Sequence, residues 1–521
     1  MKGLFGVAVC IILIFSSAAY GQYGRFKLDY TNTEFNLDSQ LIYRTVGQLK
    51  NFDFTGGGAR AAGMGKAFIG VSDDITAGSW NPAGLIIHQK PMMALSAGSM
   101  SPRGQVNPGT NSTDLKGSFS KLSYIGFVAP IRIRGHQFVG SASYGMLTEE
   151  YDQSGFTTRF YIPAATGPGS FEILQGVFKR TVTTHNTPYI VNLGFGTRIY
   201  RAVSFGLSVN VYAGGSVMNR SNMYTLENFP EFSTGSFQRS TMVGVQDVID
   251  TVKYSGVNFA IGLKHSGEKL SAGLVVKTPF TLSAGYATTI FDRAAFAGMT
   301  LRDGTDTIYR DNNLYKISVP LIAGGGIGYK ASEKLLLALD AELRMFAGNK
   351  IQDRQSVKIK PGGSTEDSFT VSNPDYRNSF VLRAGAEYTW ETGNSLFPKI
   401  PLRAGFSFVP TAAPSVTEAY ANRILDSVTY DFLGQPTKDT VFHYSLETTS
   451  SKAVTMYSLS AGMGLKWSQI RLDFAYIFST LSRSQIIGIS PVSDVNRRHQ
   501  AIISEGKNRN HSFMMTFTGY F

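Results

Sequence analysis

Apolar and polar residues alternate along most of the chain from residue 91 onward. In the segment 203–213, every odd-numbered residue from Val203 to Ala213 is apolar, and the residues between them are mostly small or polar. The segments 189–199, 400–408 and 470–478 repeat the pattern. Successive side chains point to opposite sides only in a β-strand, so these segments are predicted to be strands with one apolar face.

Fourteen segments of this kind are predicted as strands. They are 91–100, 120–130, 136–148, 188–201, 203–215, 253–266, 269–291, 314–330, 334–348, 378–391, 399–409, 452–467, 469–481 and 508–521. Pro279, inside the seventh segment, cannot donate a ladder hydrogen bond, so it marks a bulge or the rim of the sheet.

The connections between these segments alternate strictly in length. Long ones follow the odd-numbered strands, at 101–119, 149–187, 216–252, 292–313, 349–377, 410–451 and 482–507, and the others are short. Long loops outside and tight turns in the periplasm are typical of a transmembrane antiparallel β-barrel. An even strand count places both barrel ends, and the C-terminus, on the periplasmic side.

The last strand carries a further mark of this class. Phe513, Met515, Phe517 and the terminal Phe521 share one face. This resembles the insertion signal of outer-membrane barrels, although Gly519 departs from it. It implies the barrel-assembly machinery as a partner during insertion, and outer-membrane lipid and lipopolysaccharide as surroundings afterwards.

If the apolar face meets lipid, the opposite face lines the lumen. That face carries the basic candidates Arg198, Lys264, Arg383, Arg403 and Arg471, together with carboxylates such as Asp340, Glu342, Glu387 and Asp473. Facing lipid at the midplane, an Arg or Lys would cost about 2–4 kcal/mol. Structural pairing within the wall and selection of solutes both remain open for these charges.

The N-terminal segment, the single cysteine and the net charge narrow the class of protein further. Residues 1–21 combine Lys2, an apolar run and a small-residue stretch, which is typical of a cleavable secretory signal peptide. The single cysteine, Cys10, lies inside this segment, so the mature chain offers no thiol chemistry. The net charge of +12 is dispersed without a Lys/Arg block, so nucleic acid is not expected as a partner.

Residues 22–90 do not alternate, and they precede a barrel too wide for side chains alone to fill. We therefore expect them to form a hatch, with short helices, that plugs the lumen of the barrel at 91–521.

The hatch segment contains Gly58-Ala59-Arg60-Ala61-Ala62-Gly63-Met64-Gly65, then Asp73-Asp74 and Asn81-Pro82-Ala83-Gly84-Leu85. It resembles the FadL/TodX (OMPP1) family of outer-membrane transport proteins, which have a fourteen-strand barrel and an N-terminal hatch with an NPA motif. The resemblance implies uptake of long-chain fatty acids or other hydrophobic molecules. It makes Gly58, Gly63, Gly65, Asp73, Asp74, Asn81, Pro82, Ala83 and Gly84 the gating candidates. An Asn-Pro turn that only positions the hatch is the alternative for the last four.

The connection 149–187 is rich in large apolar residues for an external loop. Phe156, Phe160, Tyr161, Phe171, Leu174 and Phe178 are candidates for a surface on which a hydrophobic ligand lands. Mutual packing with the connection 216–252 is the alternative.

Enzymatic motifs such as HExxH and GxSxG are absent from the sequence, so neither catalysis nor a metal or cofactor is expected. Two functions remain. One is outer-membrane transport of hydrophobic solutes through an apolar pocket and a gated hatch. The other is a non-transporting barrel that serves as a binding or assembly component of a secretion or surface-attachment system.

Overall fold

The structure is a computed structural model, and it describes residues 56–521 apart from several short segments. These are 108–112, 117–118, 147–149, 168–169, 234–235, 297–298, 309–313, 359–364, 373–375, 394–396, 428–440, 468 and 494–497. The predicted signal peptide and residues 22–55 of the predicted hatch lie outside the described residues.

The described strands form one closed antiparallel barrel of fourteen strand positions. In order around the wall these are β1 (Met92–Asn107), β3 (Phe119–Ile133), β4 (His136–Met146), β6 (Ser170–Tyr200), β7 (Val203–Ser233), β8 (Ser236–Ser266), β9 with β10 (Leu270–Lys277, Phe280–Phe296), β13 with β12 (Ile322–Lys330, Leu314–Val319), β14 (Leu335–Arg344), β17 (Ser379–Glu391), β18 (Lys399–Ser427), β19 (Val441–Trp467), β20 (Ile470–Ser493) and β21 (Arg498–Tyr520). Pairing of Met92 with Tyr520 joins the first and last strands of the wall and closes the ring.

Each predicted strand has an observed counterpart, and two of them are interrupted at the same height. Thr278 and Pro279 separate β9 from β10, and Pro320 and Leu321 separate β12 from β13. Along β8, Ala260 pairs with Lys277 and Ser255 pairs with Ser283, so the β9–β10 side contains one extra residue. A one-residue insertion moves the following side chains to the opposite face of the sheet.

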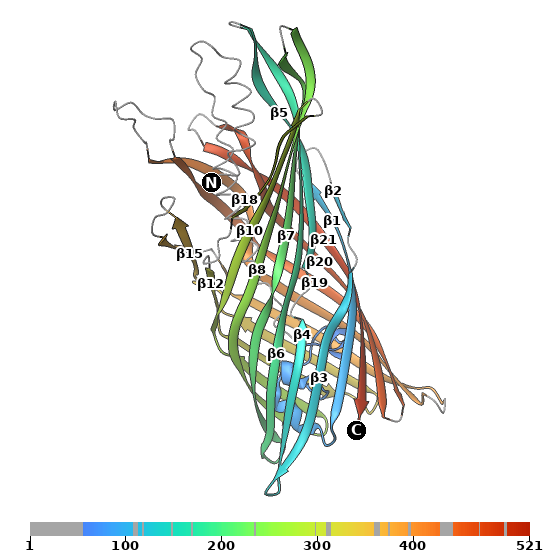
Figure 1. The fold of residues 1–521 in the computed structure, drawn as a ribbon. Coiled ribbons are helices and arrows are strands. Elements are labelled where there is room, and N and C mark those ends of the chain that lie inside the picture. The colour runs from blue at the N-terminus through green and yellow to red at the C-terminus, as the bar shows by residue number, and fades with distance from the viewer. Residues whose placement is uncertain are drawn as a thin grey trace.

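The turns at one end are short, as at Arg134–Gly135 and Arg201–Ala202. At the other end the connections are largely paired strands rather than irregular loops. For example, β7 and β8 run as a hairpin through the whole of 216–252, except for 234–235. The additional strands at this end are β2 (Thr113–Lys116), β5 (Glu150–Gly167), β11 (Met299–Ile308), β15 (Ile351–Lys358) and β16 (Thr365–Ser372). Figure 1 shows the hairpins of β5 and β7 rising far above the rest of the barrel.

The outer surface of the barrel carries the apolar face of the strands. Leu193, Phe195, Leu274, Ile327 and Leu459 are all exposed, with Leu274 at 62%. None of the helices in the described part of the chain has the length and apolar character that a bilayer crossing requires. A closed barrel with this apolar exterior is the structure of a bacterial outer-membrane protein.

Inside the barrel, the described part of the N-terminal segment forms α3 (Ala59–Gly63), α4 (Ala77–Trp80) and the 3-10 helix η2 (Pro82–Ile87). Figure 1 shows these helices enclosed by the strands at the end where the C-terminus lies. Residues 59–86 are almost entirely buried. We use the name hatch for residues 56–90.

Candidate functional site

The hatch is seated against a belt of glycines on the inner wall. Neighbouring strands supply them: Gly206 (β7), Gly262 (β8), Gly273 (β9), Gly326 (β13), Gly385 (β17), Gly405 (β18) and Gly462 (β19). A Cβ atom at any of these positions would press on hatch atoms, most of them backbone. The absence of side chains therefore lets the hatch backbone lie directly on the wall.

Strand β14 lies between β13 and β17 in the glycine belt, and it contributes a carboxylate instead of a glycine. Asp340 Oδ2 accepts hydrogen bonds from the backbone N–H groups of Phe68 (2.5 Å) and Ile69 (2.7 Å), and Oδ1 accepts one from Gly70 (3.4 Å). Asp340 is 1% exposed. On the other side of the same turn, Lys264 Nζ donates to the carbonyl oxygens of Val71 and Ser72. The turn 68–72 is thus held by an anion at its N–H groups and a cation at its carbonyls.

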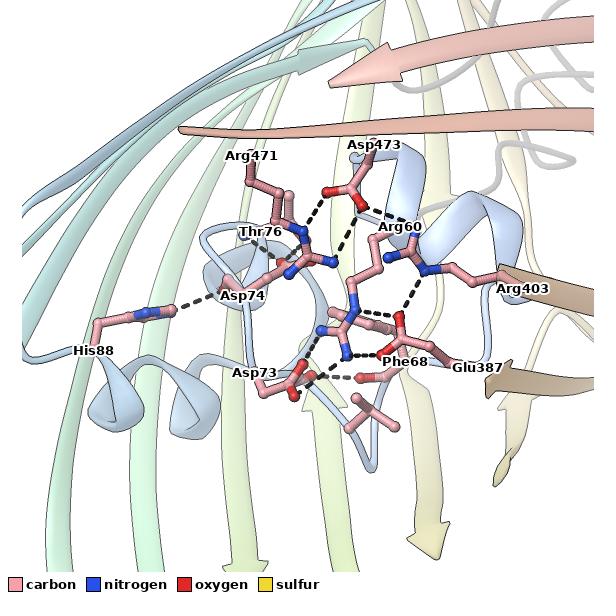
Figure 2. A network of polar contacts seen from close by, with 12 residues as sticks. Arg60, Phe68, Asp73, Asp74, Thr76, His88, Glu387, Arg403, Arg471 and Asp473 are labelled. Carbon is pink, nitrogen blue, oxygen red and sulfur yellow. Dashed lines mark hydrogen bonds and ion pairs between the residues drawn. The ribbon is translucent and has the colours of Figure 1, made fainter. Parts of the chain in front are cut away.

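Arg60 connects helix α3 to the wall through a chain of ion pairs (Figure 2). Its guanidinium donates to both carboxylate oxygens of Glu387, at 2.9 and 3.0 Å, and to Asp73 within the hatch. Glu387 also accepts from Arg403 Nε at 2.6 Å. The Arg60 and Arg403 side chains are 7% and 0% exposed, so this network is shielded from solvent.

The chain continues onto strand β20. Arg403 Nη1 lies 2.8 Å from Asp473 Oδ1, and Arg471 Nε lies 2.8 Å from Asp473 Oδ2. Arg383 pairs more loosely with Glu342, at 3.6 Å. These wall charges neutralise one another and the hatch, which is the structural pairing considered above. Buried pairs of this kind are costly to break because a lone charge remains.

The pKa values of the hatch groups reflect the same network. Burial alone would lower the pKa of Arg60, but Asp73 and Glu387 outweigh it and raise that pKa well above the ordinary value. Burial would raise the pKa of Asp73, yet the charges of Arg60 and Lys264 lower it. Burial lowers the pKa of His88, whose Nε2 lies 3.0 Å from the Asp74 carbonyl oxygen. Arg60 and Asp73 therefore remain an ion pair over a wide pH range.

The Asn-Pro-Ala-Gly segment forms a turn that touches both hatch and wall. Asn81 caps η2 by accepting from Ala83 N at 3.1 Å, and its Nδ2 donates to the carbonyl oxygen of Leu263 on β8 at 3.1 Å. Pro82 occupies the first position of η2, where no N–H is needed. A Cβ on Gly84 would press on Ser72, so the turn needs glycine there. The Asn81 side chain is thus fully occupied in holding backbone.

Further along the strands toward the extracellular end, the inner wall becomes apolar. A cluster of buried residues there spans adjacent strands: Tyr212, Met218, Val252, Tyr254, Leu282, Ala284, Ile317, Val319, Ile322, Phe346 and Ala412, with Ile190, Phe280 and Tyr376 packed against them. We call this cluster the apolar arc. Tyr212 of the arc lies six residues beyond Gly206 of the glycine belt along β7, and Ile322 lies four residues from Gly326 along β13. The arc therefore begins about 13–20 Å from the glycine belt at about 3.3 Å per residue.

The structure brings some of the predicted site residues together and separates others. Gly63, Gly65, Asp73, Lys264 and Arg403 all meet in the hatch seat or its ion-pair network. Arg198 lies exposed near the turn at 201–202, apart from this network. The landing candidates Phe156, Phe160, Tyr161, Phe171, Leu174 and Phe178 lie on β5 and β6, and their side chains are outside the described residues.

Other important residues were missed by the sequence analysis. The sequence contained a signal for the glycine belt. Gly206 and Gly405 lie on the face predicted to line the lumen, between apolar residues predicted to face lipid. An apolar pocket was expected, but the residues of the apolar arc were missed because the apolar face of every strand was assigned to lipid. Within the described ranges, no group of three or more His, Cys, Asp or Glu side chains is placed to hold a metal ion.

The fold and site define an outer-membrane β-barrel whose lumen holds an N-terminal hatch. No protein-family model matches the sequence, and no curated protein does so either. Among solved structures, the toluene transporter TbuX from Ralstonia pickettii superposes with a TM-score of 0.51 at 12% identity, covering 90% of this chain and 99% of its own.

A Pseudomonas aeruginosa FadL homologue (13% identity, TM-score 0.49) and the Pseudomonas putida toluene transporter TodX (12%, 0.49) match over the same shares of the chains. The chain therefore has the FadL/TodX-type barrel fold, and the expected resemblance is confirmed at that level.

Proposed function

We propose that this barrel carries hydrophobic small molecules, such as long-chain fatty acids, across the outer membrane, and that the hatch opens and closes the route. The observation that carries the proposal is the apolar arc on the inner wall. Barrels that conduct hydrophilic solutes have polar lumens. An arc of Leu, Ile, Val and aromatic side chains facing the bore instead favours a hydrophobic solute. The TbuX fold, found in a toluene transporter, supports the same class of solute.

The closed state of the proposed gate is the seated hatch. Its polar contacts with the wall include the Arg60–Glu387 pair and the Asp340 carboxylate under the turn 68–72. Lys264 and Ser460 add hydrogen bonds to hatch backbone. When the hatch moves, these hydrogen bonds and ion pairs between hatch and wall have to be replaced by hydrogen bonds to water. The gating candidates Gly58, Asp74, Asn81 and Pro82 act in this proposal by positioning hatch backbone rather than by contacting solute.

Capture of solute is assigned to the extracellular hairpin of β5 and β6. Its sequence places six large apolar residues, Phe156, Phe160, Tyr161, Phe171, Leu174 and Phe178, in one projecting element. Apolar surface of this extent outside a membrane usually binds something. Solute would pass from this hairpin to the apolar arc and then past the hatch.

Uptake by whole cells tests the proposal at the apolar arc. Ile317→Thr replaces a fully buried residue of the arc with a smaller β-branched residue that carries a hydroxyl group, and we expect uptake of radiolabelled oleate to fall about tenfold. Ile327→Thr, on neighbouring β13 but 46% exposed on the outer face, is the matched control and should leave uptake unchanged. Equal uptake by cells with and without the protein would refute transport of this solute class.

One observation favours the second function, a binding or assembly barrel without transport. Strands β6, β7 and β8 each have 31 residues, whereas about 9–11 suffice to cross the membrane. Most of this length projects beyond the bilayer as paired hairpins, which suits attachment to another surface. Under this second function, removal of 222–246 from β7 and β8 would abolish attachment, and the full chain itself would give no oleate uptake.

A further inference from the structure

A small polar cavity lies between the hatch and the wall strands β3, β4, β6, β7 and β9. Gly56, Gly57 and Ser79 line it from the hatch. The wall side is lined by Tyr124, Ser143, Gly145, Met146, Ile190, Asn192, Asn210, Tyr212 and Lys277. Its volume of about 20 Å³ is enough for a group the size of a water molecule.

Three asparagines on adjacent strands form a hydrogen-bonded ladder that ends in this cavity. Asn258 Nδ2 donates to the Thr278 carbonyl oxygen (3.4 Å), Asn210 Nδ2 donates to Asn258 Oδ1 (2.8 Å), and Asn192 Nδ2 donates to Asn210 Oδ1 (2.6 Å). A backbone carbonyl can only accept, so the first bond fixes the direction of the other two. The free end of the ladder is therefore an acceptor, Asn192 Oδ1.

This acceptor is buried and lacks a donor. Asn192 is 1% exposed, and among the described residues its Oδ1 has no hydrogen-bond partner. A buried acceptor without a donor lowers stability, so such a group in a cavity indicates a missing partner. The partner has to supply an N–H or O–H group.

The cavity also adjoins the apolar arc. Tyr212 belongs to both, and Ile190 lines the cavity while packing against the arc. The Tyr212 ring stacks on Phe280 with centroids 4.6 Å apart, which continues the apolar surface upward. An amphiphilic molecule could thus lie along the arc with its polar end in the cavity.

The chemistry of the cavity selects among polar ends. An ionised carboxylate has no proton to donate, so it would leave Asn192 Oδ1 without a donor. An ammonium group would be buried in a cavity whose described lining contains no carboxylate. A hydrocarbon would leave the acceptor unsatisfied. A neutral hydroxyl group donates one proton and has the right size.

We infer that the cavity receives the hydroxyl group of a hydrophobic alcohol or phenol, which donates to Asn192 Oδ1 while the rest of the molecule lies along the apolar arc. The inference rests on the proposed transport function and names a further class of hydrophobic solute for it.

Titration of the full mature chain in lipid nanodiscs tests this inference. Trp80 Nε1 donates to the carbonyl oxygen of Gly57, which lines the cavity, so Trp80 emission reports on occupancy. Trp390 and Trp467 are replaced by Phe to leave Trp80 as the sole reporter. The probes are decan-1-ol, decane and decanoate. We expect decan-1-ol to half-saturate the signal at about tenfold lower concentration than either of the others.

Two variants and two controls locate the effect. Asn192→Leu removes the acceptor, and Gly145→Ala reduces the cavity while its added Cβ makes only ordinary contacts of 3.6 and 3.7 Å. Both should abolish the preference for decan-1-ol. Ser208→Ala, outside the cavity lining, and Gly140→Ala, with open space around it, should preserve it.

The outcomes separate this inference from the proposed function. Equal affinity for decan-1-ol and decane, or a preference that survives Gly145→Ala, overturns the inference while oleate uptake still supports transport. A cavity that holds only water would give the same equality. Absence of any probe response together with absence of oleate uptake overturns both.

Discussion

Substitution of Gly405 by alanine tests how closely the hatch fits its seat. An added Cβ would lie 2.5 Å from the Gly65 Cα and closer still to the Gly65 nitrogen, whereas ordinary contact begins at 3.4 Å. The hatch backbone must therefore retreat by about 1 Å or more. That movement breaks the bond from Gly65 N to Ser460 Oγ (2.9 Å) and the bond from Ser460 Oγ to Gly63 O (3.1 Å).

The free-energy cost of this displacement can be bounded. Each lost hydrogen bond costs about 1 kcal/mol, and overpacking adds about 1–3 kcal/mol. We expect the seated state to lose roughly 3–5 kcal/mol, so its population relative to the unseated state falls at least about a hundredfold. The barrel itself should stay folded, because β18 keeps its ladder bonds.

Planar-bilayer conductance measures the effect. Gly405→Ala should raise the open fraction of the channel relative to the natural chain. Gly140→Ala is the matched control, since a Cβ there meets nothing within 4 Å. Identical conductance traces for the two alanine variants would refute the tight seating of hatch backbone on the glycine belt.

Three further predictions concern the polar contacts of the hatch. Arg60→Met removes the ion-pair partner of Asp73 and the bidentate bond to Glu387, so the open fraction of the channel should rise. Arg60→Lys should restore part of the closure. Unchanged conductance traces would show that this ion pair does not hold the hatch closed. Asp340→Ala leaves three buried N–H groups unpaired, at a cost of about 1–3 kcal/mol each, so amide hydrogen exchange at 68–70 should accelerate. Protection equal to that of the natural chain would contradict the role of the Asp340 carboxylate in holding this turn. Because the pKa of Asp73 is lowered, its contribution to seating is complete above about pH 4 and is lost as the pH falls through that lowered pKa. Conductance should thus stay low between pH 7 and 5 and rise only below about pH 4, and Asp73→Asn should remove this step.

The strand segments were predictable because each strand has one face toward lipid and the other toward the lumen. Alternation such as Val203 to Ala213 reports that boundary directly, and the observed β7 begins at Val203. The position of Pro279 also predicted the break between β9 and β10, since proline lacks the donor that a continuous ladder requires.

The same alternation misled at the apolar arc. Below the break, Gly273, Val275 and Lys277 are the buried residues of β9, whereas above it Leu282 and Ala284 are buried in β10 and Thr281 is exposed. The extra residue at the break exchanges the two faces. A rule that apolar side chains face outward therefore assigns the wrong faces to lipid and lumen in this part of the wall. Sequence periodicity alone cannot reveal that the two faces exchange at the break.

The extent of the hairpins and the role of Asp340 were beyond the sequence for another reason. Polar and apolar residues mix in 216–252, yet the segment is stabilised as strand by pairing between β7 and β8 rather than by burial of one face. Asp340 seemed to be one of several charges on the lumen side. Its contacts with Phe68 and Ile69 arise from residues some 270 positions away, which only the closed barrel brings together.

A reversible lock on the hatch tests the central claim most directly. Ala475 on β20 packs with Ala59 and Ala62 of the hatch, and the one cysteine of the chain, Cys10, lies in the predicted signal peptide. Cysteine pairs A59C/A475C and A62C/A475C can therefore form a disulfide across the seat without a competing thiol. With the single variant A475C as control, oleate uptake should stop when the linked pair is oxidised and return on reduction. Uptake that continues at the same rate through the oxidised, cross-linked protein would contradict gating by the hatch.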